Sequence, residues 1–237
     1  MRTVAWFSCG AASAVAAKLA LEDDPDTVVA RCVVSNEHPD NDRFAKDCEA
    51  WFGKPVVNLR SQKYDSCWDV WLKRRFINSP KGALCTVEMK KRVRQDFEEP
   101  GDRQVYGFTW EEDDRARRFR EGNPEVRSWF PLIERRYTKA RCYSIVRDAG
   151  LELPAMYRLG YHNANCIGCV KGGAGYWNKI RRDFPEVFER MAQVEEDVGA
   201  TVIRGKSLRE LRPGEGRHSD LVLPDCGLFC GENGGVE

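Results

Sequence analysis

The sequence predicts an α/β fold in which a parallel sheet is flanked by helices, followed by a helical C-terminal part and a tail. Two observations support this fold. Short apolar or β-branched segments alternate with helical segments over the first 60 residues, and a turn of small residues joins the first strand to the first helix. Strands that alternate with helices form βαβ units, which produce a parallel sheet with both faces covered.

The N-terminal elements follow in order. The apolar run at 4–7 predicts a strand, and the Ala-rich segment 11–22 predicts a helix. β-branched residues predict a second strand over 27–34, and an amphipathic pattern predicts a helix over 40–52. The segment 55–59 completes this part as a third strand.

Further strands are expected at 105–108 and 129–133, separated by a highly charged stretch. Thr138 near its start and Gly150 just past its end predict a helix over 138–149. A second helical region is expected over 176–198. We expect one domain over 1–204 and a Gly- and Pro-rich tail over 205–237.

The composition excludes several classes of protein. With 38 Lys and Arg against 37 Asp and Glu, the net charge is +1, unlike that of a generally basic nucleic-acid binder. A hydrophobic fraction of 42% can form a core, so the chain is not disordered. The mean hydropathy is −0.57 and no stretch approaches the roughly 20 apolar residues of a membrane helix. The N-terminus does not resemble a signal peptide, so we expect a cytoplasmic protein with no membrane partner.

Ten cysteines are the main chemical signal, because disulfides are rare in a reducing cytosol. Cys166 and Cys169 form a Cys-x-x-Cys pair, and Cys85 lies far upstream. Such thiolates bind an iron–sulfur cluster or a metal, act as a redox pair, or form half of a zinc site. The zinc alternative uses Cys166, Cys169, Cys226 and Cys230. Cys32, Cys48 and Cys67 are expected to be small buried hydrophobes.

A turn of small residues follows the first strand, where backbone N–H groups and a helix N-terminus can bind a phosphate. It reads Ser8-Cys9-Gly10-Ala11-Ala12-Ser13. Its Ser-x-Gly-x-x-Ser spacing resembles the pyrophosphate loop of the adenine nucleotide α-hydrolase superfamily, whose fold has a Rossmann-like sheet. The Asp that ATP-using members carry is replaced here by Ala12.

The C-terminal half resembles the adenylyl-sulfate and phosphoadenylyl-sulfate reductase family of that superfamily. The similar residues are Leu153 to Tyr161 followed by Cys166-Ile167-Gly168-Cys169, and Asp225-Cys226-Gly227-Leu228 near the C-terminus. Phe229 stands where the family has His, and Leu84 where it has the first cysteine of a Cys-Cys pair.

The resemblance implies that Cys226 is the nucleophile that attacks the sulfonucleotide sulfur. It implies a four-iron, four-sulfur ([4Fe-4S]) cluster on Cys85, Cys166 and Cys169, with Cys142, Cys230 or a small molecule as the fourth ligand. Lys90 and Arg92 follow Cys85 as cations do in the family, where such residues contact the substrate anion near the cluster.

The nucleotide is expected to contact the segments after the first, second and fourth strands, and cations after the fourth strand are expected to contact its anionic group. The nucleotide-binding residues are Ser8, Cys9, Gly10, Ala11, Ser13, Ser35, Asn36, Glu37 and Gly107, and the anion-binding residues are Arg115, Arg117 and Arg118.

The resemblance implies a sulfonucleotide reductase that acts on adenylyl sulfate or phosphoadenylyl sulfate with a thioredoxin-type reductant, and it leaves room for a homo-oligomer. One alternative is an ATP- and cluster-dependent sulfur transferase that thiolates a nucleobase or nucleic acid, with the basic run 115–141 as the surface for that partner. A second alternative is a nucleotide-binding protein with a structural metal and no catalytic activity.

Overall fold

The computed structural model describes residues 2–79, 82–217 and 219 of the chain. Contacts divide the described residues into two compact units, one formed by those within 2–33, 39–59 and 94–158, and the other by those within 34–38, 60–93 and 159–219. The segment 1–204, expected to form one domain, contains parts of both units. The domain boundary expected at residue 204 stays a prediction.

The first unit contains a five-stranded parallel sheet of order β3-β2-β1-β6-β7, which confirms the expected fold class. The central strands β1 and β2 are mainly apolar because their side chains are covered on both faces, whereas the edge strands β3 and β7 are partly exposed. The strands are β1 (Thr3–Trp6), β2 (Val28–Cys32), β3 (Val56–Leu59), β6 (Arg103–Val105) and β7 (Arg127–Trp129).

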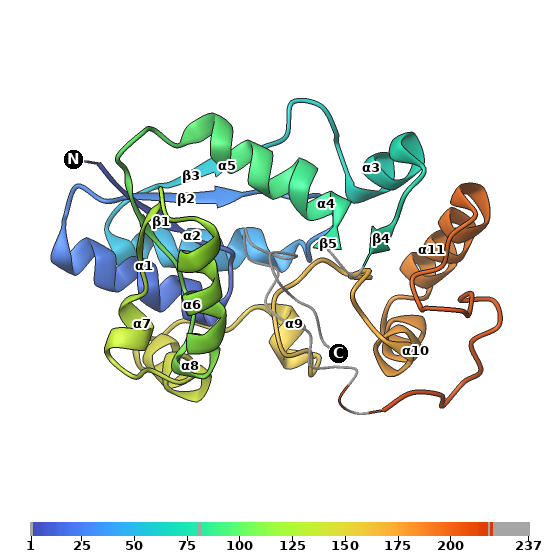
Figure 1. The fold of residues 1–237 in the computed structure, drawn as a ribbon. Coiled ribbons are helices and arrows are strands. Elements are labelled where there is room, and N and C mark those ends of the chain that lie inside the picture. The colour runs from blue at the N-terminus through green and yellow to red at the C-terminus, as the bar shows by residue number, and fades with distance from the viewer. Residues whose placement is uncertain (1, 80–81, 218, 220–237) are drawn as a thin grey trace. The chain divides into compact units, whose positions relative to one another are not determined.

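The helix α1 (Ala11–Asp23) is buried along most of its length, which explains its alanines: small side chains let the helix approach β1 on one side and α8 (Lys139–Asp148) on another. In Figure 1, α1 and α2 (Asp40–Phe52) lie below β2. Alternate residues of the first strand face opposite layers, so Phe7 contacts the rings of α2, whereas Trp6 contacts Phe97.

The other helical elements of this unit are short. They are α5 (Arg92–Phe97, which begins in the second unit), η2 (Trp110–Glu112), α6 (Asp113–Gly122), α7 (Pro131–Glu134) and α9 (Ala155–Arg158). Thr138 caps α8 by accepting a hydrogen bond from the Arg141 N–H at 3.2 Å, as its position in the sequence predicts.

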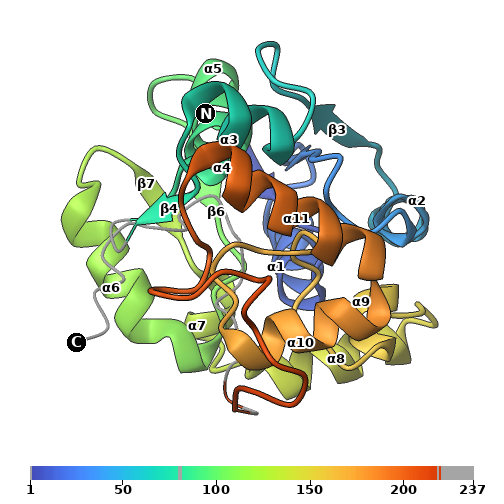
Figure 2. The same ribbon diagram turned by 90° about the vertical axis from the view of Figure 1, so that its right-hand side faces the viewer.

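The second unit is mainly helical. Its elements are α3 (Cys67–Arg74), β4 (Asn78–Ser79), β5 (Gly82–Ala83), α4 (Leu84–Thr86), the π-helix η1 (Val87–Lys91), α10 (Ala174–Asp183) and α11 (Pro185–Val198). β4 and β5 form an antiparallel pair. α11 packs against α10 and α3, and Figure 2 shows α11 beside α3. The core of this unit includes Trp71, Tyr176, Trp177 and Met191.

Three of the expected elements differ from the structure, and prolines explain two differences. The strand expected at 129–133 ends at Trp129, because Pro131 fixes the first turn of α7. The helix expected at 176–198 is two helices, because Pro185 removes a backbone donor and starts α11. The strand expected at 105–108 is Arg103–Val105, where its pairing with β1 ends.

No helix among the described residues is long and apolar enough to cross a membrane.

Candidate functional site

The loop at Ser8–Ser13 joins the carboxyl end of β1 to the N-terminus of α1. The Ser13 hydroxyl accepts a hydrogen bond from the Ser8 N–H at 3.1 Å and donates one to the Gly10 carbonyl at 2.9 Å, so the loop is closed on itself. Cys9 has a φ of 57°, a conformation that non-glycine residues seldom adopt and that recurs at functional sites. The N-cap residue of α1 is Gly10, which has no side chain to cap the first turn, and N–H groups at a helix N-terminus suit an anion.

Gly107 lies against this loop, after the end of the neighbouring strand β6. A Cβ atom at Gly107 would stand 2.6 Å from the Ser13 Cα and 2.7 Å from the Ser13 nitrogen. Glycine is therefore required for the segment after β6 to approach the first turn of α1 this closely. Both segments lie at the carboxyl edge of the sheet, where parallel α/β sheets bind their ligands.

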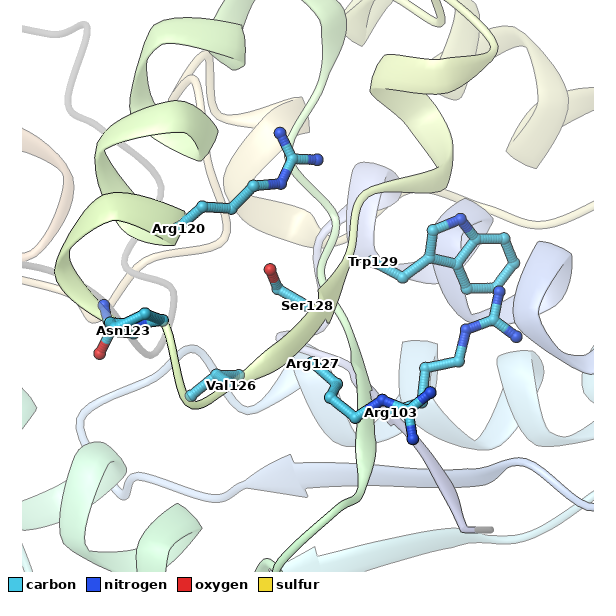
Figure 3. Close-up of a pocket in the computed structure, with 8 residues that line it drawn as sticks. Arg103, Arg120, Asn123, Val126, Arg127, Ser128 and Trp129 are labelled. Carbon is cyan, nitrogen blue, oxygen red and sulfur yellow. The ribbon is translucent and has the colours of Figure 1, made fainter.

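A cavity of about 490 Å³ occurs elsewhere in the same unit and includes Arg103, Arg120 and Arg127 (Figure 3). Arg103 stacks on Trp129 at 3.8 Å and pairs with Asp23. Arg103 and Arg127 begin their strands, so this cavity lies at the amino edge of the sheet. Its position is opposite to the one expected for a nucleotide, and we do not assign it to the site.

The second unit brings three cysteines together. Cys67 lies near Cys85 and Cys166, because both cysteines act on the pKa of its thiol. These contacts and burial raise the pKa of Cys67, whereas the contact with Cys67 and the charge of Lys90 lower the pKa of Cys85. Cys85 is partly exposed. We call Cys67, Cys85 and Cys166 the thiol cluster.

Cys67 is buried, as expected for a small hydrophobe, and it also has Cys85 and Cys166 as neighbours. Its position follows from the start of α3, where the Ser66 hydroxyl accepts a hydrogen bond from the Asp69 N–H at 3.1 Å. The Ser-x-x-Asp spacing is a readable helix-start signal that places Cys67 in the first turn. Its nearness to Cys166 is a matter of tertiary structure.

Cys169 completes a turn that Tyr176 supports. The Tyr176 hydroxyl accepts a hydrogen bond from the Cys169 N–H at 2.9 Å and donates one to the Cys166 carbonyl at 3.4 Å. Gly168 has a φ of 74°, and a Cβ atom there would lie 2.8 Å from Val187. The sequence alone did not indicate Tyr176 as part of the site.

Asn36 and Glu37, expected to contact a nucleotide, have partners in the second unit. The Asn36 side chain accepts a hydrogen bond from the Cys67 N–H at 2.7 Å, and its carbonyl accepts one from the Ile167 N–H at 2.8 Å. Asn36 thus ties α3 to the Cys-x-x-Cys turn. Ser35, for its part, donates to the Asp65 carbonyl at 2.7 Å. Nucleotide binding by these three residues stays a prediction.

Two donors lie beside Cys85. Lys90, in the π-helix η1, forms an ion pair with Glu37 at 3.0 Å, and both side chains are less than a tenth exposed. The buried indole N–H of Trp71 has no hydrogen-bond partner among the described residues. Trp71 is near enough to Cys85 to lower the pKa of that thiol. Both donors favour a negatively charged sulfur at Cys85.

The remaining arginines expected to bind the substrate have local partners. Arg92 pairs with Glu88 and is half exposed. Arg115 pairs with Glu112 at 2.7 Å, Arg117 pairs with Asp114 at 2.6 Å, and Arg118 donates to the Asp114 carbonyl at 3.3 Å. Their contact with a substrate anion stays a prediction.

Of the expected fourth ligands, Cys142 lies in the apolar core of the first unit, where burial raises its pKa to about 12. We therefore do not assign it to the metal site. Cys226 and Cys230 lie outside the described residues.

With the side chains positioned as they are, no group of three or more His, Cys, Asp or Glu residues within 2–79, 82–217 and 219 could hold a metal ion. A rotation about χ1 moves a cysteine sulfur by roughly 3 Å with no backbone change. The donor set, with the orphaned Trp71 N–H beside it, fits a thiolate-bound cluster or zinc.

A scan against protein-family models finds no match for this chain, and a search of the curated proteins finds none either.

Proposed function

We propose that this protein is a sulfonucleotide reductase whose substrate is adenylyl sulfate or phosphoadenylyl sulfate. The observation that carries the proposal is the thiol cluster with the buried cation Lys90 beside it. The α/β unit of the same chain has, at Ser8–Ser13, a loop of the kind that binds phosphate. Cys85, Cys166 and Cys169 would hold a [4Fe-4S] cluster, whose chemistry here is to supply charge next to the substrate.

The loop at Ser8–Ser13, which we call the phosphate loop, supports binding of the nucleotide phosphate. Backbone N–H groups in the first turn of α1 would donate to the phosphate oxygens, and the hydroxyls of Ser8 and Ser13 fix the shape of the loop. Lys90 supports the chemistry because its charge is buried and its ion pair holds it in place. Arg92 is half exposed, so it could exchange Glu88 for a sulfate group.

Cys226 supplies the nucleophile in this proposal. Its thiolate attacks the sulfur of the sulfonucleotide, a new S–S bond forms, and the S–O bond breaks with its electron pair leaving on AMP or its 3′-phosphate form. The enzyme then carries a cysteine S-sulfonate. A thioredoxin-type dithiol attacks the cysteine sulfur, becomes a disulfide and releases sulfite.

The test is sulfite release from either nucleotide by anaerobically purified protein with a dithiol reductant. We expect Cys226→Ser to abolish sulfite release and the matched variant Cys230→Ser to retain it. Mass spectrometry of protein treated with nucleotide alone should detect one added sulfonate on the wild type and none on Cys226→Ser. Undiminished sulfite release by Cys226→Ser would refute the assignment, and release of pyrophosphate from ATP would favour the sulfur transferase.

A further inference from the structure

Cys67 lies between two cysteines that the proposed function places at the metal centre. Cys67 lies beside the Cys166–Cys169 turn, because Asn36 accepts hydrogen bonds from the backbone N–H groups of both Cys67 and Ile167. Cys85 and Cys166 both act on the thiol of Cys67. The residue is 3% exposed, and its backbone N–H is held by the Asn36 side chain at 2.7 Å. Cys67 therefore occupies a fixed position with two other thiols as neighbours.

Buried cysteines elsewhere in the chain have different surroundings. Cys48 and Cys142 belong to the apolar core of the first unit, among alanine, valine, leucine and aromatic side chains. They behave as small hydrophobes, a role common for buried cysteine. Cys67 does not share this environment, so packing alone does not account for it.

Trp71 provides an independent observation at the same place. It follows Cys67 by four residues on α3, so the two side chains share a face of the helix. Its buried indole N–H has no hydrogen-bond partner within the part of the chain that the structure describes. Buried donors are nearly always paired, and sulfur atoms of thiolate-bound metal centres accept such N–H groups.

We propose that Cys67 is the fourth thiolate ligand of the metal centre, which is then bound by Cys67 of α3, Cys85 of α4 and the Cys166–Cys169 turn. In identifying the centre as a [4Fe-4S] cluster, this inference rests on the proposed function. The family that this chain resembles has a cysteine at the position of Leu84, so this chain lacks one of the expected thiolate ligands. Cys67 supplies the missing thiolate from another segment.

A consequence follows for the chemistry of the site. With four protein thiolates, every iron of the cluster has a protein ligand, and none is open to an external sulfide. Such a centre suits a reductase, in which it supplies charge, and not a sulfur transferase that holds sulfide on an open iron.

The experiment measures iron and acid-labile sulfide in the full-length chain, purified anaerobically as wild type, Cys67→Ser and Cys142→Ala. We expect about four irons and four sulfides per chain in the wild type and in Cys142→Ala. In Cys67→Ser we expect about three irons, or loss of the cluster. Cys142→Ala is a matched control because Cys142 is also buried and lies in the apolar core.

A measurement on the wild type keeps the test independent of how the variants fold. Ferricyanide takes one electron from a cluster with an open iron, that iron leaves as Fe²⁺, and a three-iron cluster with a characteristic EPR signal remains. We expect the wild type to resist this conversion. Ready conversion of the wild type, or an intact four-iron cluster in Cys67→Ser, would overturn the role of Cys67 and leave the reductase proposal standing.

A finding of zinc in the purified protein would test the two proposals separately. One zinc and no sulfide in the wild type would refute the cluster of the proposed function. Loss of that zinc in Cys67→Ser, with retention in Cys142→Ala, would still support Cys67 as a ligand, and retention in both would refute it. A wild type without any metal would refute both proposals.

Discussion

Gly107→Ala tests whether the close approach of the segment after β6 to the phosphate loop shapes that loop. The new Cβ atom would stand 2.6 Å from the Ser13 Cα and 3.0 Å from the Ala12 carbonyl carbon. Ordinary contacts begin near 3.4 Å, so the two backbones must separate by about 0.8 Å. Both neighbours are main-chain atoms in a buried helical turn and cannot rotate away. We expect a destabilisation of about 2–3 kcal/mol, the upper range for overpacking.

The assay is urea unfolding followed by tryptophan fluorescence, together with calorimetric titration of the folded protein with AMP. We expect Gly107→Ala to weaken AMP binding at least about tenfold, equivalent to about 1.4 kcal/mol, because the loop N–H groups move. Gly53→Ala is the control: Gly53 has a φ of 70° and nothing within 4 Å of a Cβ atom, so it bears only a conformational cost of about 1 kcal/mol. Wild-type stability of Gly107→Ala would refute the packing argument, and unchanged AMP binding in a destabilised variant would refute the loop as the nucleotide site.

Three further predictions concern individual side chains. Hydrogen bonds from Arg43 lower the pKa of Asp40 from 3.8 to about 2, so Asp40→Asn should lower the free energy of unfolding by up to about 2 kcal/mol at neutral pH. The difference from wild type should vanish as the pH falls from 4 to 2. A pH-independent difference in urea unfolding would contradict this prediction. Lys90→Met leaves a buried carboxylate at Glu37 and should lower the free energy of unfolding by about 3–5 kcal/mol. The double variant Lys90→Met with Glu37→Met should largely restore this stability in thermal unfolding. An equal loss of stability in the single and double variants would argue against the ion pair. Tyr176→Phe removes the hydroxyl that holds the Cys166–Cys169 turn, and competition with a chelator should show a roughly 10- to 100-fold weaker metal centre, whereas unchanged affinity would exclude this supporting role.

The order of strands and helices in the first unit could be predicted from the sequence because the signals are local. Alternation of apolar and amphipathic segments is read within ten residues, and α2 begins and ends at the residues its pattern indicates. The breaks before α7 and α11 also have local signals in Pro131 and Pro185, which act through missing donors and a fixed φ.

The site was only partly predictable. The phosphate loop and the Cys-x-x-Cys turn lie within short stretches of sequence, so their spacing is visible without a structure. The indole of Trp71 and the hydroxyl of Tyr176 were not identified, because an aromatic residue in a helix has the same pattern whether it packs in a core or supports a metal site.

The sequence by itself determined the α/β class, the glycine- and serine-bearing loop after β1 and the paired cysteines at 166 and 169. Only the tertiary structure decided which of the other cysteines belongs with them. Cys67 and Cys166 are about a hundred residues apart, and the contact between them depends on Asn36, which binds both α3 and the turn. Burial alone makes Cys67 and Cys142 look alike, whereas their neighbours, thiols in one case and apolar side chains in the other, give them different chemistry.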